Sequence, residues 1–142
     1  MKLRTVSWVL LAIVGVMVLL VSFVSANLAY RGDYPIAGVS INEIAAGRDA
    51  VLVGLRGVRG TSAAWGAAWA ALFLAVVVGP YRRGDTTAWW GILASVLVLG
   101  AVAAARAVLL PGQPAGTGAP LLILAIVLVA LLLDVKRLAG AR

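Results

Sequence analysis

The chain has 142 residues, 63% of them hydrophobic, and a mean hydropathy of +1.08. A soluble domain of this size cannot bury so much apolar surface, because its core fills only part of its volume. The net charge of +7 does not indicate nucleic acid binding, since the cations mostly flank apolar runs, where they meet anionic lipid head groups. The sequence therefore predicts an all-α integral membrane bundle of four transmembrane helices, forming a single domain.

The composition also removes most catalytic and metal-binding chemistry. Cysteine is absent, which excludes disulfides and thiolate metal sites, and histidine is absent, which removes the commonest general base. The sequence holds no phosphate-binding loop, metal-ligand cluster or nucleophile–base pair. We therefore expect a non-enzymatic protein without a cofactor.

The first predicted span covers residues 6–25 and follows a basic start, Lys2 and Arg4. At about 1.5 Å per residue this run is roughly 30 Å long, enough to cross the hydrocarbon core. A cleaved signal peptide is the competing interpretation, because Val24-Ser25-Ala26 fits a small-residue cleavage site. The run is longer than a signal-peptide core, which favours an uncleaved helix. In both cases the next segment starts on the outer side.

Residues 26–47 form a predicted external loop, whose helix breakers are Gly32, Pro35 and Gly38. Within it, Ser40-Ile-Asn-Glu43 matches a capping box, in which the serine hydroxyl and the glutamate carboxylate satisfy reciprocal backbone donors. A helix is therefore expected to start near Ile41 and to break or bend at Gly47.

The second predicted span covers residues 48–79. It is longer than the hydrocarbon core is thick, so its outer turns are expected to project into the head groups or beyond. Gly79-Pro80 is expected to end this helix, because proline disfavours helix at the residue before it. Residues 80–87 then form a tight internal loop.

The third predicted span covers residues 88–110, and a polar external loop covers 111–119. The fourth span covers 120–134, and Pro120 suits its first turn, where the N–H that proline lacks is not needed. Residues 135–142 form a basic tail.

The distribution of cations predicts the orientation, because lysine and arginine collect on the cytoplasmic side of a membrane protein. One side holds Lys2, Arg4, Arg82, Arg83, Lys136, Arg137 and Arg142, and the other holds Arg31, Arg48, Arg56, Arg59 and Arg106. The first set is larger, so we place both termini in the cytoplasm. A belt of aromatic residues is expected at the same boundary, made of Trp8, Tyr81, Trp89 and Trp90.

Small residues predict where the helices touch, since they let backbones approach closely in lipid. The second span offers Gly60-xxx-Ala64 and Ser62-xxx-Gly66-xxx-Ala70, and the third offers Gly91-xxx-Ser95 and Gly100-xxx-Ala104.

Three arginines are the first candidate site residues. Arg59 and Arg106 are predicted at a similar height, near the outer hydrocarbon boundary, with Arg56 one turn above Arg59. In one interpretation each side chain reaches individually to water and lipid phosphate. In the other, all three converge into a cationic pocket for an anionic head group or carboxylate.

Glu43 and Asp49 are candidate acids for anchoring the external loop, together with Asp33. Asp49 and Arg56 are seven residues apart and so share a helix face. A pair between one of these acids and the arginines would hold the loop over the mouth of the bundle. The alternative is that they are solvated loop charges.

Three motifs stand out together: GRDAVLVGLRGVRG at the start of the second span, a Tyr-Arg-Arg-Gly-Asp turn followed by Trp89-Trp90, and ARAVLLPGQP at the end of the third span. On these motifs the sequence resembles the small four-helix bacterial membrane proteins of unknown function, broadly of the DoxX-like kind. The resemblance implies a four-helix membrane bundle and no established activity.

We therefore expect a small multi-pass protein of the bacterial inner (plasma) membrane. Its predicted role is that of an accessory or interaction subunit, partnered by the phospholipid bilayer and by a second copy or another membrane protein. The alternative hypothesis is a binder or carrier of an anionic lipid or another lipid-like small molecule.

Overall fold

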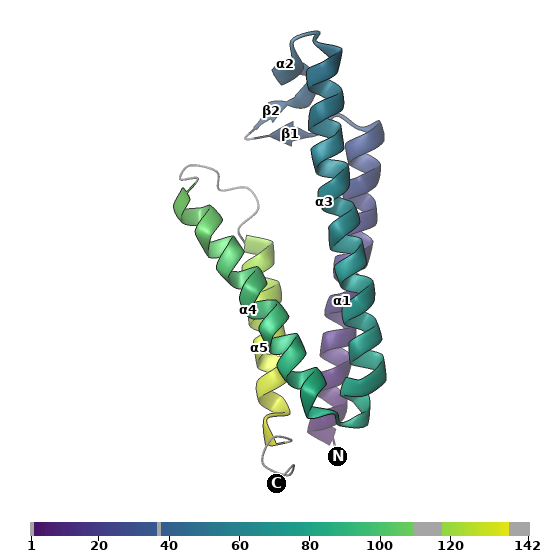
Figure 1. Cartoon of the computed structure of the whole chain (residues 1–142), viewed down its shortest axis with the longest axis vertical. Helices are drawn as coiled ribbons and strands as arrows, with labels where there is room; N and C mark the ends of the chain where they lie inside the picture. Colours follow the sequence, from purple (N-terminus) through teal and green to yellow (C-terminus); the bar gives the residue numbers. More distant parts are fainter. Residues whose placement is uncertain (1, 37, 110–117, 137–142) are drawn as a thin grey trace. The chain divides into compact units, whose positions relative to one another are not determined.

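The computed structural model describes residues 2–36, 38–109 and 118–136. Within these ranges it is helical apart from one short hairpin, which confirms the predicted all-α class (Figure 1). The elements are α1 (Lys2–Arg31), β1 (Pro35–Ile36), β2 (Val39–Ser40), α2 (Ile41–Ala45), α3 (Asp49–Val76), the π-helix η1 (Val77–Tyr81), α4 (Thr86–Leu109) and α5 (Gly118–Leu133). They form two compact units: a central unit, Val16–Ala71, and a terminal unit that combines Met1–Gly15 with Leu72–Arg142.

Three helices of the described chain are long and apolar enough to cross a membrane, namely Thr5–Arg31, Asp49–Tyr81 and Thr86–Arg106. In the most apolar stretch of each helix, only 22% of the residues are buried. The fourth predicted span corresponds to a shorter apolar helix, Leu121–Leu133. Most apolar side chains of the long helices therefore face away from the protein, as they do in helices that lipid surrounds.

Helix α1 continues past the predicted 6–25 span to Arg31, so residues 26–31 belong to the helix and not to the external loop. Packing explains the extension. Ala29 is fully buried. Tyr30 lies so close to Gly60 of α3 that a Cβ at this glycine would overlap the phenol ring. Gly60 thus marks a helix contact, as predicted.

The chain passes through Gly79-Pro80 without leaving the helix, which corrects the helix end predicted there. Helix α3 continues into η1, and Pro80 lies inside this π-helix. In an α-helix the proline ring would clash with the carbonyl four residues earlier, and the wider π turn relieves that contact.

The loop between η1 and α4 is shorter than the predicted internal loop, 80–87, because the helix continues past Pro80. It consists of a turn at Gly84 and Asp85. Gly84 has a φ of +104°, a conformation that glycine adopts without steric cost. The Asp85 carboxylate accepts a 2.7 Å hydrogen bond from the Thr87 backbone N–H and so caps the start of α4.

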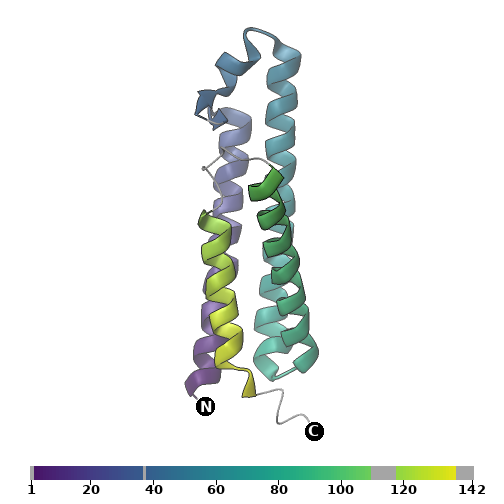
Figure 2. The same cartoon turned by 90° about the vertical axis from the view of Figure 1, so that its left-hand side faces the viewer.

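Helices α4 and α5 lie side by side in both views (Figures 1 and 2). Helix α4 begins slightly before the predicted 88–110 span, and α5 begins slightly before the predicted 120–134 span and ends at Leu133. At their contact, a Cβ on Gly100 would lie 3.2 Å from the Leu124 side chain. The contact predicted at Gly91 is not found, because a Cβ there would meet no atom within 4 Å. Most of the predicted 111–119 loop and of the 135–142 tail lies outside the described residues.

A buried polar cluster in the terminal unit holds the end of α5. Ser7 is fully buried, and its hydroxyl lies 2.6 Å from the Tyr81 hydroxyl and donates to the Ala130 carbonyl at 2.7 Å. The Trp89 indole N–H donates to the Leu131 carbonyl at 3.2 Å. Both carbonyls lie in the last turn of α5, where a helix leaves its C=O groups without a partner one turn ahead. The Leu131 carbonyl also accepts a 3.1 Å hydrogen bond from the Asp134 backbone N–H. Side chains from α1, η1 and α4 therefore complete this helix end.

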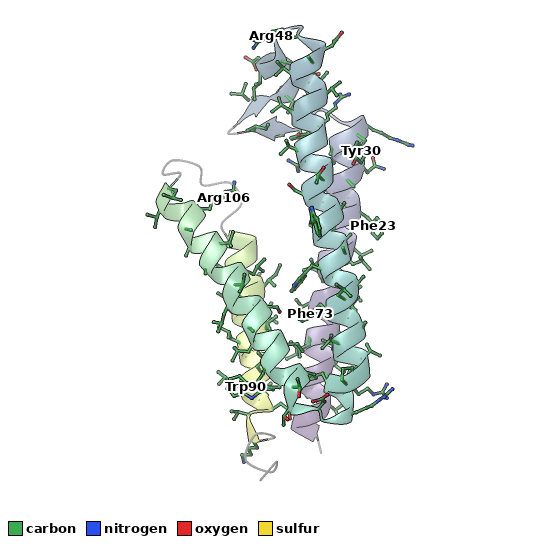
Figure 3. The ribbon with its side chains drawn as sticks, in the orientation of Figure 1. Phe23, Tyr30, Arg48, Phe73, Trp90 and Arg106 are labelled. Atoms are coloured by element: carbon green, nitrogen blue, oxygen red, sulfur yellow. The ribbon has the colours of Figure 1, made fainter. Side chains whose placement is uncertain are left out.

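This cluster corrects part of the predicted aromatic belt. Tyr81 and Trp89 are buried, with 0% and 6% of their surface exposed, because both rings turn inward to make these hydrogen bonds. Trp90 is 56% exposed and projects from α4 (Figure 3). Trp8 is half-buried and lies under the Arg82 guanidinium, 4.8 Å from the ring centroid. Trp8 and Trp90 therefore lie at the protein surface, as an aromatic belt at the membrane boundary requires.

The segment between α1 and α3, which the sequence predicts to be external and which is called the external segment below, contains the β1–β2 hairpin. The sequence pattern did not predict this hairpin. The strands are antiparallel, with Pro35 opposite Ser40 and Ile36 opposite Val39. Gly38, in the turn between them, has a φ of +87°. With only two residues in each strand, the pattern is too short to show any alternation of side chains.

The start of α2 shows the serine part of the predicted capping box. Helix α2 starts at Ile41, and the Ser40 hydroxyl accepts a 3.1 Å hydrogen bond from the Asn42 backbone N–H. The helix ends at Ala45. The next two residues, Ala46 and Gly47, both have positive φ, which confirms the break predicted at Gly47.

Candidate functional site

Tyr34 fastens the external segment to α3 in the central unit. Only 4% of its surface is exposed, and its hydroxyl donates a 2.9 Å hydrogen bond to the Leu55 carbonyl. The ring therefore has a fixed position, since both its apolar body and its polar tip have partners.

Arg59 lies directly above this ring. The carbon at the centre of its guanidinium is 4.1 Å from the centroid of Tyr34, the geometry of a cation–π contact. Arg56 is three residues earlier and so projects from the same side of α3. The structure thus brings together two of the three predicted arginines and adds a tyrosine beneath one of them.

Both arginines are half-buried, and the Nε atoms of Arg56 and Arg59 are buried without a hydrogen-bond partner among the described residues. Buried polar atoms in folded proteins are nearly always hydrogen-bonded, because desolvation without a new partner costs free energy. The two guanidinium groups are therefore partly desolvated cations whose charge the central unit does not neutralise.

The acids of the external segment do not supply the missing charge. Glu43, on α2, and Asp49, at the start of α3, are both exposed, and neither forms an ion pair with Arg56 or Arg59 in the part of the chain that the structure describes. Asp49 lies in the first turn of its helix, where a carboxylate interacts favourably with the helix dipole. The hydrogen bond that joins this segment to α3 is made by Tyr34.

Asp33 is engaged elsewhere. The Ser40 hydroxyl lies 2.7 Å from both of its carboxylate oxygens and donates to them. This hydrogen bond holds the pKa of Asp33 below its ordinary value of 3.8. The contact ties the segment after α1 to the cap of α2. The glutamate half of the predicted capping box is not formed, since Glu43 makes no hydrogen bond with Ser40 within the described ranges.

Arg106 is exposed and projects from the last turn of α4, in the terminal unit (Figure 3). Its convergence with Arg56 and Arg59 stays a prediction, because those two belong to the central unit.

No protein-family model matches the chain, and no curated protein or solved structure is significantly similar to it. The DoxX-like resemblance therefore stays a prediction. The chemistry of the site has to be argued from its own residues.

These residues suit binding of an anion better than catalysis. Arginine carries a permanent charge and several N–H donors in a planar fork, but it does not exchange protons near neutral pH. Among residues 2–36, 38–109 and 118–136, no group of three or more Asp or Glu side chains is placed to hold a metal ion. The Arg56–Arg59–Tyr34 cluster can therefore hold and orient an anion.

Sequence reasoning missed Tyr34. The available signal was its position, a tyrosine between Asp33 and Pro35 in a segment otherwise rich in small and polar residues. A lone aromatic ring in such a segment needs a surface to cover it, and the nearest apolar surface belongs to the flanking helices.

Proposed function

We propose that the chain is a multi-pass protein of a bacterial inner membrane that crosses the bilayer four times, with both termini in the cytoplasm, and acts as a non-enzymatic accessory or interaction subunit. The observation that carries the membrane assignment is the exposed apolar surface of the three long helices, each only 22% buried in its most apolar stretch. Water would make exposure of so much apolar surface unfavourable, whereas lipid does not.

The fourth span is the shortest. Helix α5 has 16 residues and reaches roughly 24 Å, somewhat less than the thickness of the hydrocarbon core. Its last turn already has hydrogen-bond donors from Ser7 and Trp89, so its carbonyls do not need water there. Local thinning of the bilayer accommodates a short span at a modest cost.

The absence of native cysteine makes the topology directly testable, because a single introduced cysteine is the only thiol. We expect a membrane-impermeant maleimide to label Glu43→Cys in intact cells and to label Arg83→Cys and Lys136→Cys only after the membrane is opened. Labelling of Lys136→Cys in intact cells would show that the fourth helix does not cross.

Trp65→Cys tests insertion itself. This side chain is 74% exposed, so it would react readily if it faced water. In lipid it is shielded from a polar reagent, and we expect no labelling until the protein is denatured. Rapid labelling in closed membranes, or release of the protein by alkaline carbonate without detergent, would refute the membrane assignment.

The accessory role predicts a protein partner. Extraction in mild detergent and affinity purification are expected to recover a second copy or another membrane protein in fixed stoichiometry. A monodisperse monomer that copurifies with lipid alone would instead favour the second candidate function, a binder or carrier of a lipid-like anion. That candidate is supported by the unneutralised guanidinium groups of Arg56 and Arg59.

A further inference from the structure

We propose that Arg56, Arg59 and Tyr34 form a binding site for the phosphate group of an anionic lipid. This inference rests on the proposed function, because the lipid reaches the site from the bilayer around the helices.

The charge of the cluster is the first argument. Arg56 and Arg59 present two cations on one side of α3, and their buried Nε atoms have no acceptor within the described ranges. The neighbouring Asp33 is engaged with the Ser40 hydroxyl. A bound anion would neutralise both guanidinium groups and would accept the hydrogen bonds that the central unit leaves open.

The position of Arg59 is the second argument. Its guanidinium lies on the Tyr34 ring, 4.1 Å from the centroid, and the ring is held by its hydrogen bond to the Leu55 carbonyl. Contact with a fixed aromatic face restricts the position of the guanidinium group. A planar fork of N–H donors matches the oxygens of a phosphate group. Tyr34 is therefore a positioning residue for Arg59.

The place of the cluster along α3 is the third argument and identifies a lipid as the source of the phosphate. Directly after Arg59 the chain carries no charge from residue 60 to residue 81. A segment of this length, at about 1.5 Å per residue, covers the hydrocarbon thickness, so Arg59 lies where that core meets the head groups. Phospholipid phosphates occupy this level, and their acyl chains extend along the apolar part of the helix.

The experiment uses the full chain, purified in mild detergent and reconstituted in nanodiscs of phosphatidylcholine with a minor fraction of phosphatidylglycerol. Native mass spectrometry after release from the disc reports how much phosphatidylglycerol stays bound. We expect the wild-type protein to retain it in preference to phosphatidylcholine. We expect Arg56→Gln and Arg59→Gln to lower retention about tenfold each, since a charge-assisted hydrogen bond is lost at each site.

Two sets of variants separate this site from general charge. The matched control is Arg31→Gln with Arg48→Gln, which removes two exposed cations of the same unit and is expected to change retention less than about twofold. Arg59→Lys keeps the charge but not the planar fork, and is expected to lose most of the retention. Tyr34→Phe keeps the ring but loses the hydrogen bond to the Leu55 carbonyl, and its retention is expected to lie between that of the wild type and that of Tyr34→Leu. Tyr34→Leu is expected to bind as weakly as Arg59→Gln.

Several outcomes would overturn the inference. Equal losses in the Arg31/Arg48 control and in the Arg56 and Arg59 variants would show that only net charge matters. Wild-type retention by Arg59→Lys would remove the argument from geometry. Displacement of the lipid by an equal concentration of glycerol phosphate would identify a soluble phosphate, not a lipid, as the ligand. Each of these results leaves membrane insertion intact, because insertion is measured separately by cysteine labelling.

Discussion

Replacing Ser7 with alanine is expected to loosen the last turn of α5. The Ser7 hydroxyl accepts from Tyr81 and donates to the Ala130 carbonyl, and all three residues are fully buried. In a soluble core, a buried polar group that loses its partner costs about 1–3 kcal/mol. Hydrogen bonds between membrane helices contribute less, about 0.6 kcal/mol on average and about 1.7 at most. Because the substitution removes two bonds, we expect it to lower the free energy of unfolding by about 1–3 kcal/mol.

A double-mutant cycle isolates the bond between the two hydroxyls. Ser7→Ala, Tyr81→Phe and the double variant are compared by reversible unfolding in mixed micelles, followed by the circular dichroism of the helices. The coupling energy is expected to be about 0.6–1.7 kcal/mol, the range measured for single interhelical hydrogen bonds.

Ser95→Ala is the matched control. Its hydroxyl is half-buried and donates to the Ile92 carbonyl, 2.9 Å away within the same helix. It therefore joins no two helices, and its loss is expected to change the free energy of unfolding by less than about 0.5 kcal/mol. A coupling energy of zero between Ser7 and Tyr81, or a Ser95→Ala effect as large as that of Ser7→Ala, would refute the role assigned to the cluster.

The other predictions concern close packing and pH. A Cβ on Gly15 would lie 2.7 Å from the Leu74 side chain, so Gly15→Ala is expected to destabilise the terminal unit by about 1–3 kcal/mol in the same assay. Gly91 has open space around it, so Gly91→Ala is expected to stabilise by about 0.5–1 kcal/mol, and a loss there would contradict the packing argument. The pKa of Asp33 is lowered chiefly by the Ser40 hydroxyl, so its contribution to the α2 cap is present above about pH 4 and is lost as the pH falls through the lowered value. The protection factors of the α2 amides, which are corrected for the slower intrinsic exchange in acid, should therefore fall as the pH is lowered, and Asp33→Asn should show low protection factors at all pH values.

The helices could be predicted from the sequence because their signals are long. An apolar run that extends over a whole helix leaves little choice of secondary structure, and the start of α3 and both ends of α5 fall within a few residues of their expected places. The end of α1 was harder, since residues 26–31 are less apolar than the run before them, and the burial of Ala29 and the contact of Tyr30 with Gly60 depend on the fold. The π turn at Pro80 was not predictable either, because it depends on a change of hydrogen-bond register and not on residue type.

The candidate site was predictable in part. Arg56 and Arg59 stand out because charges beside an apolar run are costly and need a partner. Pairing with Glu43 or Asp49 was a reasonable expectation from charge alone, but the direction of each side chain depends on the fold of the external segment. Tyr34 reaches α3 through the β1–β2 hairpin, which is formed by only two residues in each strand and has almost no sequence signal.

The two polar clusters of this chain differ in one respect that bears on function. Around Ser7, a hydroxyl, an indole and two helix-end carbonyls satisfy one another, so this cluster contributes stability and needs nothing further. Around Arg59, two charged side chains have buried donors without acceptors among the described residues, so this cluster carries an energetic cost that a bound anion would relieve.

Stability and lipid retention should therefore respond in opposite ways to substitutions in the two clusters. Ser7→Ala is expected to lower the free energy of unfolding without changing the retention of phosphatidylglycerol. Arg56→Gln is expected to reduce retention while leaving the lipid-free protein as stable as wild type or slightly more stable, because removing an unneutralised, partly buried charge relieves its desolvation. Loss of stability in lipid-free Arg56→Gln would show that this arginine already has a structural partner, and the argument for a ligand would fail with it.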